Sequence, residues 1–170
     1  VILDYAHNPA AVKAMCDLVD RFEAKGKRIV VLSAPGDRRD EDIREIAEIA
    51  SGHFDHFICR CDDNRRGRGA DEVAVMLKNR LLEKGISADQ IEVVPDEQEA
   101  NSHALEMAQP DDLILMLGDN VKRTWKQIIY FNSGTRAESG GNTSSASVDL
   151  PQFEDFDLAS DVEIISDERG

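Results

Sequence analysis

Residues 28–38 read Arg-Ile-Val-Val-Leu-Ser-Ala-Pro-Gly-Asp-Arg, an apolar run that ends in a glycine-containing turn. A second run of this kind, Leu-Ile-Leu-Met-Leu, occupies residues 113–117. Both runs are continuously apolar and do not alternate with polar residues, which is typical of parallel strands covered on both faces. The two runs therefore indicate a parallel sheet buried between helices.

Other β-rich runs alternate with helical patterns as far as residue 132, as in βα units on a parallel sheet. The strands are expected at residues 1–4, 28–33, 54–61, 91–94 and 113–117, with a sixth strand at the sheet edge over 125–131. The sequence thus predicts an α/β, Rossmann-like domain of three layers. Its mostly parallel sheet of about six strands should have helices on both faces.

Apolar residues recur at helical spacing in four segments between the predicted strands. The first two helices are expected to stop at Gly26 and Gly52, with glycine C-caps, and the third at Gly85. The fourth opens with Asp96, followed three residues later by Glu99, a pair that resembles a capping box.

Residues 133–170 differ in composition from the part before them. Eleven of the fifteen residues 133–147 are Ser, Gly, Thr or Asn, which bury too little apolar surface to offset the entropy of ordering. Nine acidic and two basic residues give this segment a charge of −7, half of the chain's −14. We expect a domain over 1–132 and a low-complexity, disordered acidic tail over 133–170, with a docking peptide as the alternative.

The composition argues against several classes of partner and location. A net charge of −14 disfavours nucleic acid as a ligand. The apolar runs are far shorter than the about 20 residues of a membrane span, and no leader peptide is evident, so we expect a cytoplasmic protein without a membrane contact. The three cysteines lack metal spacing and are expected to be free thiols in a reducing compartment, with no metal site.

Three loops after predicted strands carry chemically useful side chains, and ligands of open α/β sheets bind at the carboxyl ends of strands. Residues 4–9 read Asp-Tyr-Ala-His-Asn-Pro, residues 33–40 read Ser-Ala-Pro-Gly-Asp-Arg-Arg-Asp, and residues 61–69 read Cys-Asp-Asp-Asn-Arg-Arg-Gly-Arg-Gly. Arg38 could offer a forked cation to phosphate beside a helix N-terminus. Structural roles are the alternative, with Asn8 and Asp40 as helix caps.

Together the three loops resemble motifs of the C-terminal domain of the Mur ligase superfamily, whose ATP-dependent members include peptidoglycan-precursor ligases and folylpolyglutamate synthetase. The resemblance covers residues 1 to about 132 and none of the tail. It implies that the first two loops bind the nucleotide through Asp4, His7, Asn8, Gly36, Asp37 and Arg38. It also implies that His7 and Arg38 support catalysis from this domain.

The third loop resembles the Asp-Asn-Pro-Arg loop with which the superfamily reads the amino acid being added. Arg65 stands where the family has proline, and two further arginines follow. Three guanidinium groups flanked by carboxylates suit a ligand with both charges, such as an arginine being joined to the aspartate β-carboxylates of a poly-aspartate backbone. The expected substrate-binding residues are Asp62, Asn64, Arg65, Arg66 and Arg68. A solvated basic turn is the alternative.

The resemblance also implies parts that the sequence does not contain. The phosphate-binding loop Gly-x-x-x-x-Gly-Lys-Thr does not occur in it, and its first residue, Val1, lies within a predicted strand. We therefore expect a preceding central ATPase domain that holds ATP and the Mg²⁺ ligands, so that this fragment is inactive alone, and a homo-oligomer of the full enzyme. Another Mur-type ligase, a degenerate scaffold and a stand-alone Rossmann-like binding domain are the alternatives. The turn at residues 118–120 departs from the family's Gly-Lys-Gly-His-Glu, which leaves its role open.

Overall fold

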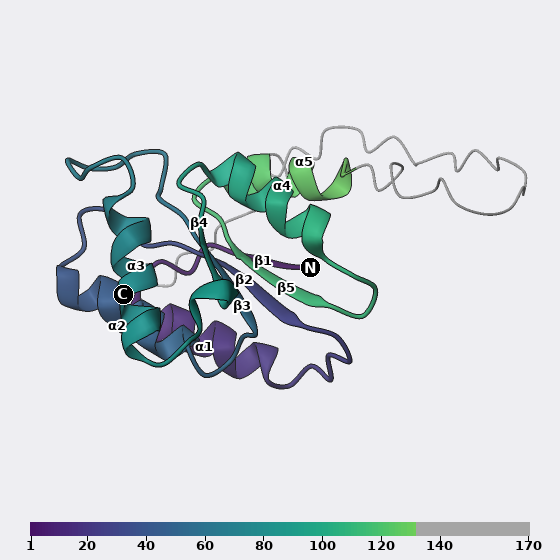
Figure 1. The fold of residues 1–170 in the computed structure, drawn as a ribbon. Helices are drawn as coiled ribbons and strands as arrows, with labels where there is room; N and C mark the ends of the chain where they lie inside the picture. The colour runs from purple at the N-terminus through teal and green to yellow at the C-terminus, as the bar shows by residue number, and fades with distance from the viewer. Residues whose placement is uncertain (132–170) are drawn as a thin grey trace, which may run out of the picture. The chain divides into compact units, whose positions relative to one another are not determined.

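The computed structural model describes residues 1–131, and the predicted tail lies outside them. The described residues form the following elements: β1 (Ile2–Asp4), α1 (Pro9–Val19), β2 (Arg28–Leu32), α2 (Asp40–Ala50), β3 (His56–Cys59), α3 (Glu72–Glu83), the 3-10 helix η1 (Ala88–Gln90), β4 (Ile91–Val93), α4 (Glu97–Met107), β5 (Leu113–Leu117) and α5 (Val121–Ile129). Strands and helices alternate along the chain, as expected for βα units (Figure 1). The predicted α/β fold is confirmed.

The sheet has five strands in the described residues, in the order β1-β5-β2-β3-β4. All four neighbouring pairs are parallel, and Val30 in β2 pairs with Phe57 on one side and Leu115 on the other. Continuous apolar runs therefore did mark the strands at the centre of the sheet. The last strand along the chain, β5, lies between the first two.

The predicted sixth strand over 125–131 is wrong, because these residues lie mainly in α5. The Asn120 side chain accepts a hydrogen bond from the Arg123 N–H at 3.1 Å and so caps the helix. Thr124 on one face is buried, whereas Trp125 and Ile129 are exposed. The apolar residues of this segment thus follow a helical period, which a short β-prone run does not distinguish from a strand.

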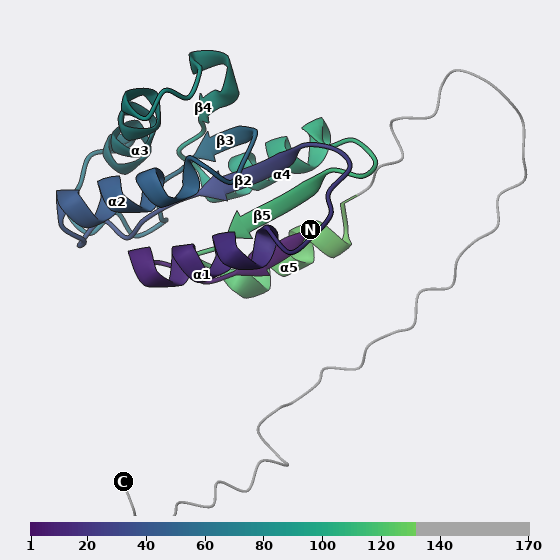
Figure 2. The same cartoon turned by 90° about the horizontal axis from the view of Figure 1, so that it is seen from below.

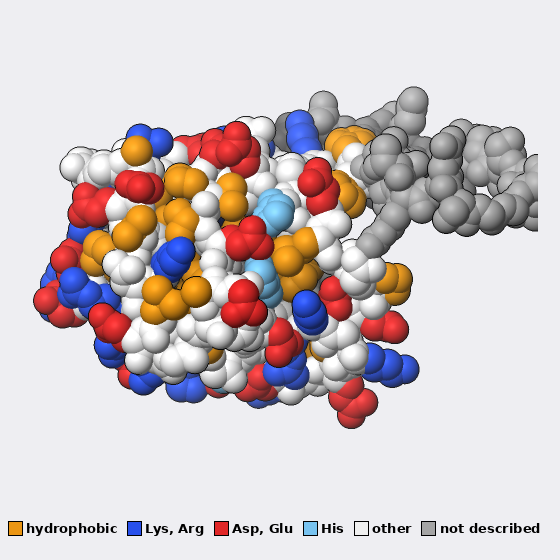
Figure 3. Space-filling model, viewed as in Figure 1, with side chains coloured by type: hydrophobic (Ala, Val, Ile, Leu, Met, Phe, Trp, Pro, Cys, Tyr) orange, Lys and Arg blue, Asp and Glu red, His pale blue; other side chains and the backbone are white. Residues whose placement is uncertain are grey.

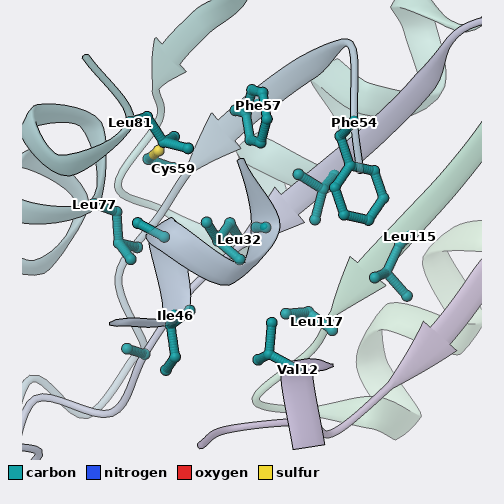
Figure 4. Packing of buried hydrophobic residues seen from close by; sticks show 14 of the residues in the cluster. Val12, Leu32, Ile46, Phe54, Phe57, Cys59, Leu77, Leu81, Leu115 and Leu117 are labelled. Atoms are coloured by element: carbon teal, nitrogen blue, oxygen red, sulfur yellow. The ribbon is translucent and has the colours of Figure 1, made fainter. Parts of the chain in front are cut away.

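Helices cover both faces of the sheet, with α1, α2 and α3 on one face and α4 and α5 on the other (Figure 2). The larger core lies between β2, β3, β5 and the first group of helices. Figure 4 shows its packing, in which Leu32 and Leu117 from the sheet meet Val12 and Ile46 from the helices. Close packing on both faces fixes the strands, and with them the positions of the loops that follow each strand.

The predicted helix ends were right only in part. Helix α1 ends at Val19, well before Gly26, whose N–H donates to the Asp111 carbonyl at 3.1 Å in the turn before β2. Helix α2 ends near Gly52, but its C-cap is Ser51, and Gly52 does not have the positive φ of a glycine cap. Only Gly85, with φ of 87°, ends its helix α3 in the predicted way.

No helix in residues 1–131 has the length and apolarity needed to cross a bilayer. The three cysteines are free and buried, which confirms the expectation of unpaired thiols.

Candidate functional site

The carboxyl ends of the parallel strands lie at one edge of the sheet, where the three polar loops gather. The loops over 4–9, 33–40 and 61–69 follow β1, β2 and β3, and the turn at 118–120 follows β5. The Gly118 N–H donates to the Asp4 carbonyl at 2.9 Å and ties the first loop to this turn. The sheet topology therefore brings together segments that are more than a hundred residues apart in the sequence.

The first loop is ordered by its own side chains. The Asp4 carboxylate accepts from the Ala6 N–H at 2.7 Å, and the Asn8 side chain accepts from the Ala11 N–H at 2.9 Å as the N-cap of α1. The His7 ring packs against Tyr5, with ring centroids 4.8 Å apart. The capping role of Asn8 is confirmed, and the nucleotide roles of Asp4, His7 and Asn8 stay predictions.

The second loop turns beside the N-terminus of α2. The Arg38 N–H donates to the Pro35 carbonyl at 3.1 Å, and Gly36 is buried. The Nε atom of Arg38 is buried and has no hydrogen-bond partner among the described residues. The predicted cap Asp40 is wrong, because Arg39 is the N-cap, without a side-chain hydrogen bond, and Asp40 begins the helix. Asp40 belongs instead to an acidic first turn, which the helix dipole favours.

Two of the three arginines in the third loop are paired with the second loop. Arg66 donates from Nη1 to Asp37 at 2.6 Å, and this hydrogen bond lowers the pKa of the Asp37 carboxyl. The Arg68 guanidinium donates to the Gly36 and Arg38 carbonyls, both at 2.8 Å. The residues predicted for the nucleotide and those predicted for the amino acid are therefore in direct contact with one another.

Arg65 is exposed, like Arg66, but unlike Arg66 and Arg68 its side chain makes no hydrogen bond or ion pair among the described residues. It lines a pocket of ≈ 270 Å³ at the carboxyl ends of β3 and β4. The pocket is otherwise lined by Cys61, Asp62, Asp63, Pro95 and Asp96. Three carboxyl groups and one guanidinium give this pocket both signs of charge.

Two carboxyl groups of the pocket, those of Asp62 and Asp63, belong to a partly buried ionic network that sequence reasoning missed. Arg60 and Glu97 are both fully buried, with Arg60 Nη2 3.4 Å from Glu97 Oε1. Arg60 Nη1 also lies 3.3 Å from Asp62 Oδ1. Arg123 at the start of α5 pairs with Glu97 and, at 2.6 Å, with Asp63. The network joins the ends of β3, β4 and β5.

The pKa values of the neighbouring residues Asp62 and Asp63 are shifted in opposite directions, the first by burial and the second by a hydrogen bond. Desolvation raises the pKa of Asp62, against the opposing charge of Arg60. The hydrogen bond from Arg123 lowers the pKa of Asp63. Glu97 also accepts from the Asp119 N–H at 2.7 Å, so the same network orders the turn after β5.

Within residues 1–131, no cluster of three or more His, Cys, Asp or Glu side chains could hold a metal ion. Acidic and basic side chains are interspersed over the face drawn in Figure 3.

Comparison with known proteins shows which family the chain belongs to. The family described as "Mur ligase, glutamate ligase domain" matches residues 1–120. The chain is 36% identical over 122 residues to cyanophycin synthetase of Crocosphaera subtropica, and 36% over 122 residues to that of Synechocystis sp.. Each match covers 72% of this chain and 14% of the relative. The chain thus spans about a seventh of the length of these relatives.

A second group of relatives consists of diaminopimelate ligases. The chain is 32% identical over 120 residues to UDP-N-acetylmuramoyl-L-alanyl-D-glutamate--2,6-diaminopimelate ligase of Caldanaerobacter subterraneus, covering 69% of this chain and 23% of the relative. A solved structure of such a ligase has a TM-score of 0.56 at 22% identity, over 67% of this chain and 22% of that one. The structure of E. coli FolC in complex with DHPP and ADP also has a TM-score of 0.56, at 18% identity, and the match covers 74% of this chain and 27% of that one. These structural matches show the fold.

Proposed function

The chain belongs to the Mur ligase family, as its glutamate ligase domain, and on this basis we propose that it is the C-terminal, substrate-closing domain of an ATP-dependent amide ligase. The proposed enzyme is of the cyanophycin synthetase type and joins arginine to the aspartate β-carboxylates of a poly-aspartate backbone. The observation that carries the substrate assignment is the pocket in which the unpaired Arg65 faces a group of carboxyl groups.

The charges of this pocket match those of an incoming arginine. A free arginine carries an α-carboxylate and a guanidinium, which call for a cation and an anion in one site. Arg65 would bind the carboxylate, and Asp62 and Asp96 would face the guanidinium. Asn64 and Arg66 border the pocket in sequence, and Asn64 accepts the Arg66 N–H at 3.1 Å, so they would support the same ligand from the loop.

The first two loops would form the nucleotide side of the cleft. The unpartnered, buried Nε of Arg38 and the backbone at Gly36 beside the α2 N-terminus fit a phosphate group. Asp4 would accept from the ribose, and His7 would lie nearer the phosphates, with Asn8 and Asp37 completing the loops. The residues of this chain fit ATP as one wall of a site, with the phosphate-binding loop and the Mg²⁺ ligands on the preceding domain.

In the proposed reaction, the aspartate β-carboxylate attacks the γ-phosphorus of ATP, giving an acyl phosphate and ADP. The α-amine of arginine then attacks the acyl carbon, loses a proton, and expels phosphate to leave an isopeptide bond. The positive charge of Arg38 and a hydrogen bond from His7 would stabilise the transferring phosphoryl group, which is the main demand of such chemistry. Closure of this domain would exclude water from the acyl phosphate.

The proposal requires the rest of a larger enzyme. The matched segment makes up about a seventh of each of these relatives, and the Gly-x-x-x-x-Gly-Lys-Thr loop does not occur in the sequence. We therefore propose that this chain alone is inactive and that it works with a preceding ATPase domain in a homo-oligomeric, cytoplasmic enzyme.

The test is arginine incorporation into a poly-aspartate primer by the full-length enzyme with ATP. His7→Ala should lower kcat, and Arg65→Ala should raise the KM for arginine by at least about tenfold, as for the loss of a charge-assisted pair. Arg21→Ala is the matched control, since Arg21 is exposed and follows α1 at the opposite edge of the sheet.

Two results would contradict the assignment. If Arg65→Ala and Arg21→Ala give the same KM for arginine, the pocket does not bind the amino acid. If the enzyme ligates diaminopimelate and not arginine, the family stands but the substrate is wrong. Ligation by residues 1–170 alone would overturn the need for a preceding domain.

A further inference from the structure

We propose that Arg68 is a positioning residue that joins the loop 33–40 and the loop 61–69 into one unit, so that the nucleotide side and the amino-acid side of the site move together. The catalytic consequence of this inference rests on the proposed function. The physical coupling of the two loops does not, because it follows from contacts within the chain.

The Arg68 side chain reaches from its own loop, 61–69, to partners on the loop 33–40, including Asp40, and at the start of α3. Its Nε donates to the Gly36 carbonyl and its Nη2 to the Arg38 carbonyl, each at 2.8 Å. Nη2 also donates to Asp40 Oδ1 and Nη1 to Glu72 Oε1, again at 2.8 Å each. The side chain is only 17% exposed. A guanidinium with this set of acceptors has little capacity left for a ligand, which favours a positioning role over the direct substrate contact predicted from the sequence.

The backbones of the two loops also touch where Arg68 holds them. A Cβ atom placed on Gly36 would lie 2.2 Å from the Arg65 carbonyl oxygen, so only glycine allows this approach. The same Arg65 carbonyl accepts from the Arg68 N–H at 3.0 Å and closes the turn of the third loop. Positive φ angles of 49° at Arg66 and 91° at Gly67 make this turn possible.

The position of Arg65 therefore depends on Arg68. Arg65 begins the turn that Arg68 ends, and its backbone rests on Gly36 in the nucleotide loop. The ion pair between Asp37 and Arg66 is a second link between the loops, but it is more exposed, with Asp37 51% accessible. Loss of Arg68 should thus displace both Arg65 and the backbone around Arg38. The binding of arginine and of ATP should therefore both weaken, although Arg68 contacts neither in this proposal.

The coupling is tested by amide hydrogen exchange on the full chain, with no ligand present. Arg68→Ala should speed exchange at the Arg38 and Arg66 amides by about tenfold or more, as expected when charge-assisted hydrogen bonds are lost. Arg68→Lys should give an intermediate effect, because one ammonium cannot reach all four acceptors. Arg80→Ala is the matched control, since Arg80 in α3 pairs with Glu48 of α2 and with Glu83 of its own helix, away from the loops.

The functional consequence is tested in the full-length enzyme. Arg68→Ala should raise the KM for ATP and the KM for arginine together, whereas Arg65→Ala should raise only the latter. If the parent enzyme shows no ATP-dependent ligation, the proposed function fails and the exchange result still decides whether the loops are coupled. If Arg68→Ala does not fold, Arg68→Lys carries both measurements.

Three outcomes would overturn the inference. Unchanged exchange at Arg38 and Arg66 in the Arg68 variants would show that the loops are not coupled through this side chain. An increase in the KM for arginine alone would make Arg68 a direct substrate contact. Faster exchange with both KM values unchanged would restrict Arg68 to a structural role without effect on the site.

Discussion

Replacing Glu97 with glutamine should destabilise the chain strongly, although the two side chains have nearly the same shape. Glu97 is fully buried and accepts from the Asp119 N–H at 2.7 Å, beside the guanidinium groups of Arg60 and Arg123. Glu97→Gln removes the negative charge between two arginines and turns one acceptor oxygen into a donor. Among the residues that the structure describes, Arg60 keeps Asp62 alone as an ionic partner, at 3.3 Å.

The magnitude follows from this burial. Removing one partner of a buried ion pair costs about 3 to 5 kcal/mol, and the remaining aspartates place the effect near the lower end, at about 3 kcal/mol. For a domain of this size the melting temperature should fall by roughly 10 °C. Urea-induced unfolding of the chain, followed by circular dichroism, should show a lower midpoint with an unchanged m value.

Glu48→Gln is the matched control. Glu48 also binds two cations, Arg80 and, at 2.9 Å, Lys84, but its side chain is 42% exposed, so water replaces much of what is lost. Its unfolding midpoint should stay close to that of the parent. If Glu97→Gln and Glu48→Gln unfold at the same urea concentration, the buried charge of Glu97 does not stabilise the fold more than an exposed one.

Three further outcomes are expected. Gly36→Ala should destabilise the chain by about 1 to 3 kcal/mol in the same urea assay, because its methyl group would meet the Arg65 carbonyl at 2.2 Å; an unchanged midpoint would show that the loops separate easily. In an NMR titration, Arg123→Gln should raise the pKa of Asp63, which the hydrogen bond from Arg123 lowers. The Asp63–Arg123 pair therefore stabilises the fold at pH values above the ordinary carboxyl pKa, and this stabilisation is lost as the pH falls through the lowered pKa of Asp63. An Asp63 pKa that is equal in the parent and in Arg123→Gln would argue against this ion pair. Burial raises the pKa of Cys59 to about 12, so this thiol should react with a disulfide reagent at pH 8 only after unfolding, and rapid labelling of the folded chain would contradict its burial.

The central part of the fold was predictable because its signal is unambiguous. The runs at 28–32 and 113–117 are too short for helices and continuously apolar, and both are strands. The segment 125–131 misled because a few apolar, β-prone residues fit either period, and the deciding feature, the cap at Asn120, lies before them. Gly26 does not cap α1 but packs against the turn at 111–112, a contact with a distant segment that the local sequence does not reveal.

The part of the site that consists of local sequence motifs was predictable. The loops after β1, β2 and β3 could be placed at one edge because each follows a recognisable strand. The Arg60–Glu97–Arg123 network could not, because its members are 26 or more residues apart and each alone looks ordinary. An arginine inside an apolar run, as in Phe-Ile-Cys-Arg-Cys, was the one available signal, since such a residue needs a buried partner.

The position of β5 between β1 and β2 has a consequence for how the chain acquires its structure. β1 pairs only with β5 within the described sheet, so this strand has no hydrogen-bonded neighbour in the sheet until residues 113–117 have been synthesised. The strands β2 to β4 can pair in chain order. Insertion of β5 comes last and forms its pairs with β1 and with β2 together. The loop that begins at Asp4 is therefore completed last, and a ribosome-bound chain stopped before β5 would lack that part of the site while most of its sheet had already formed.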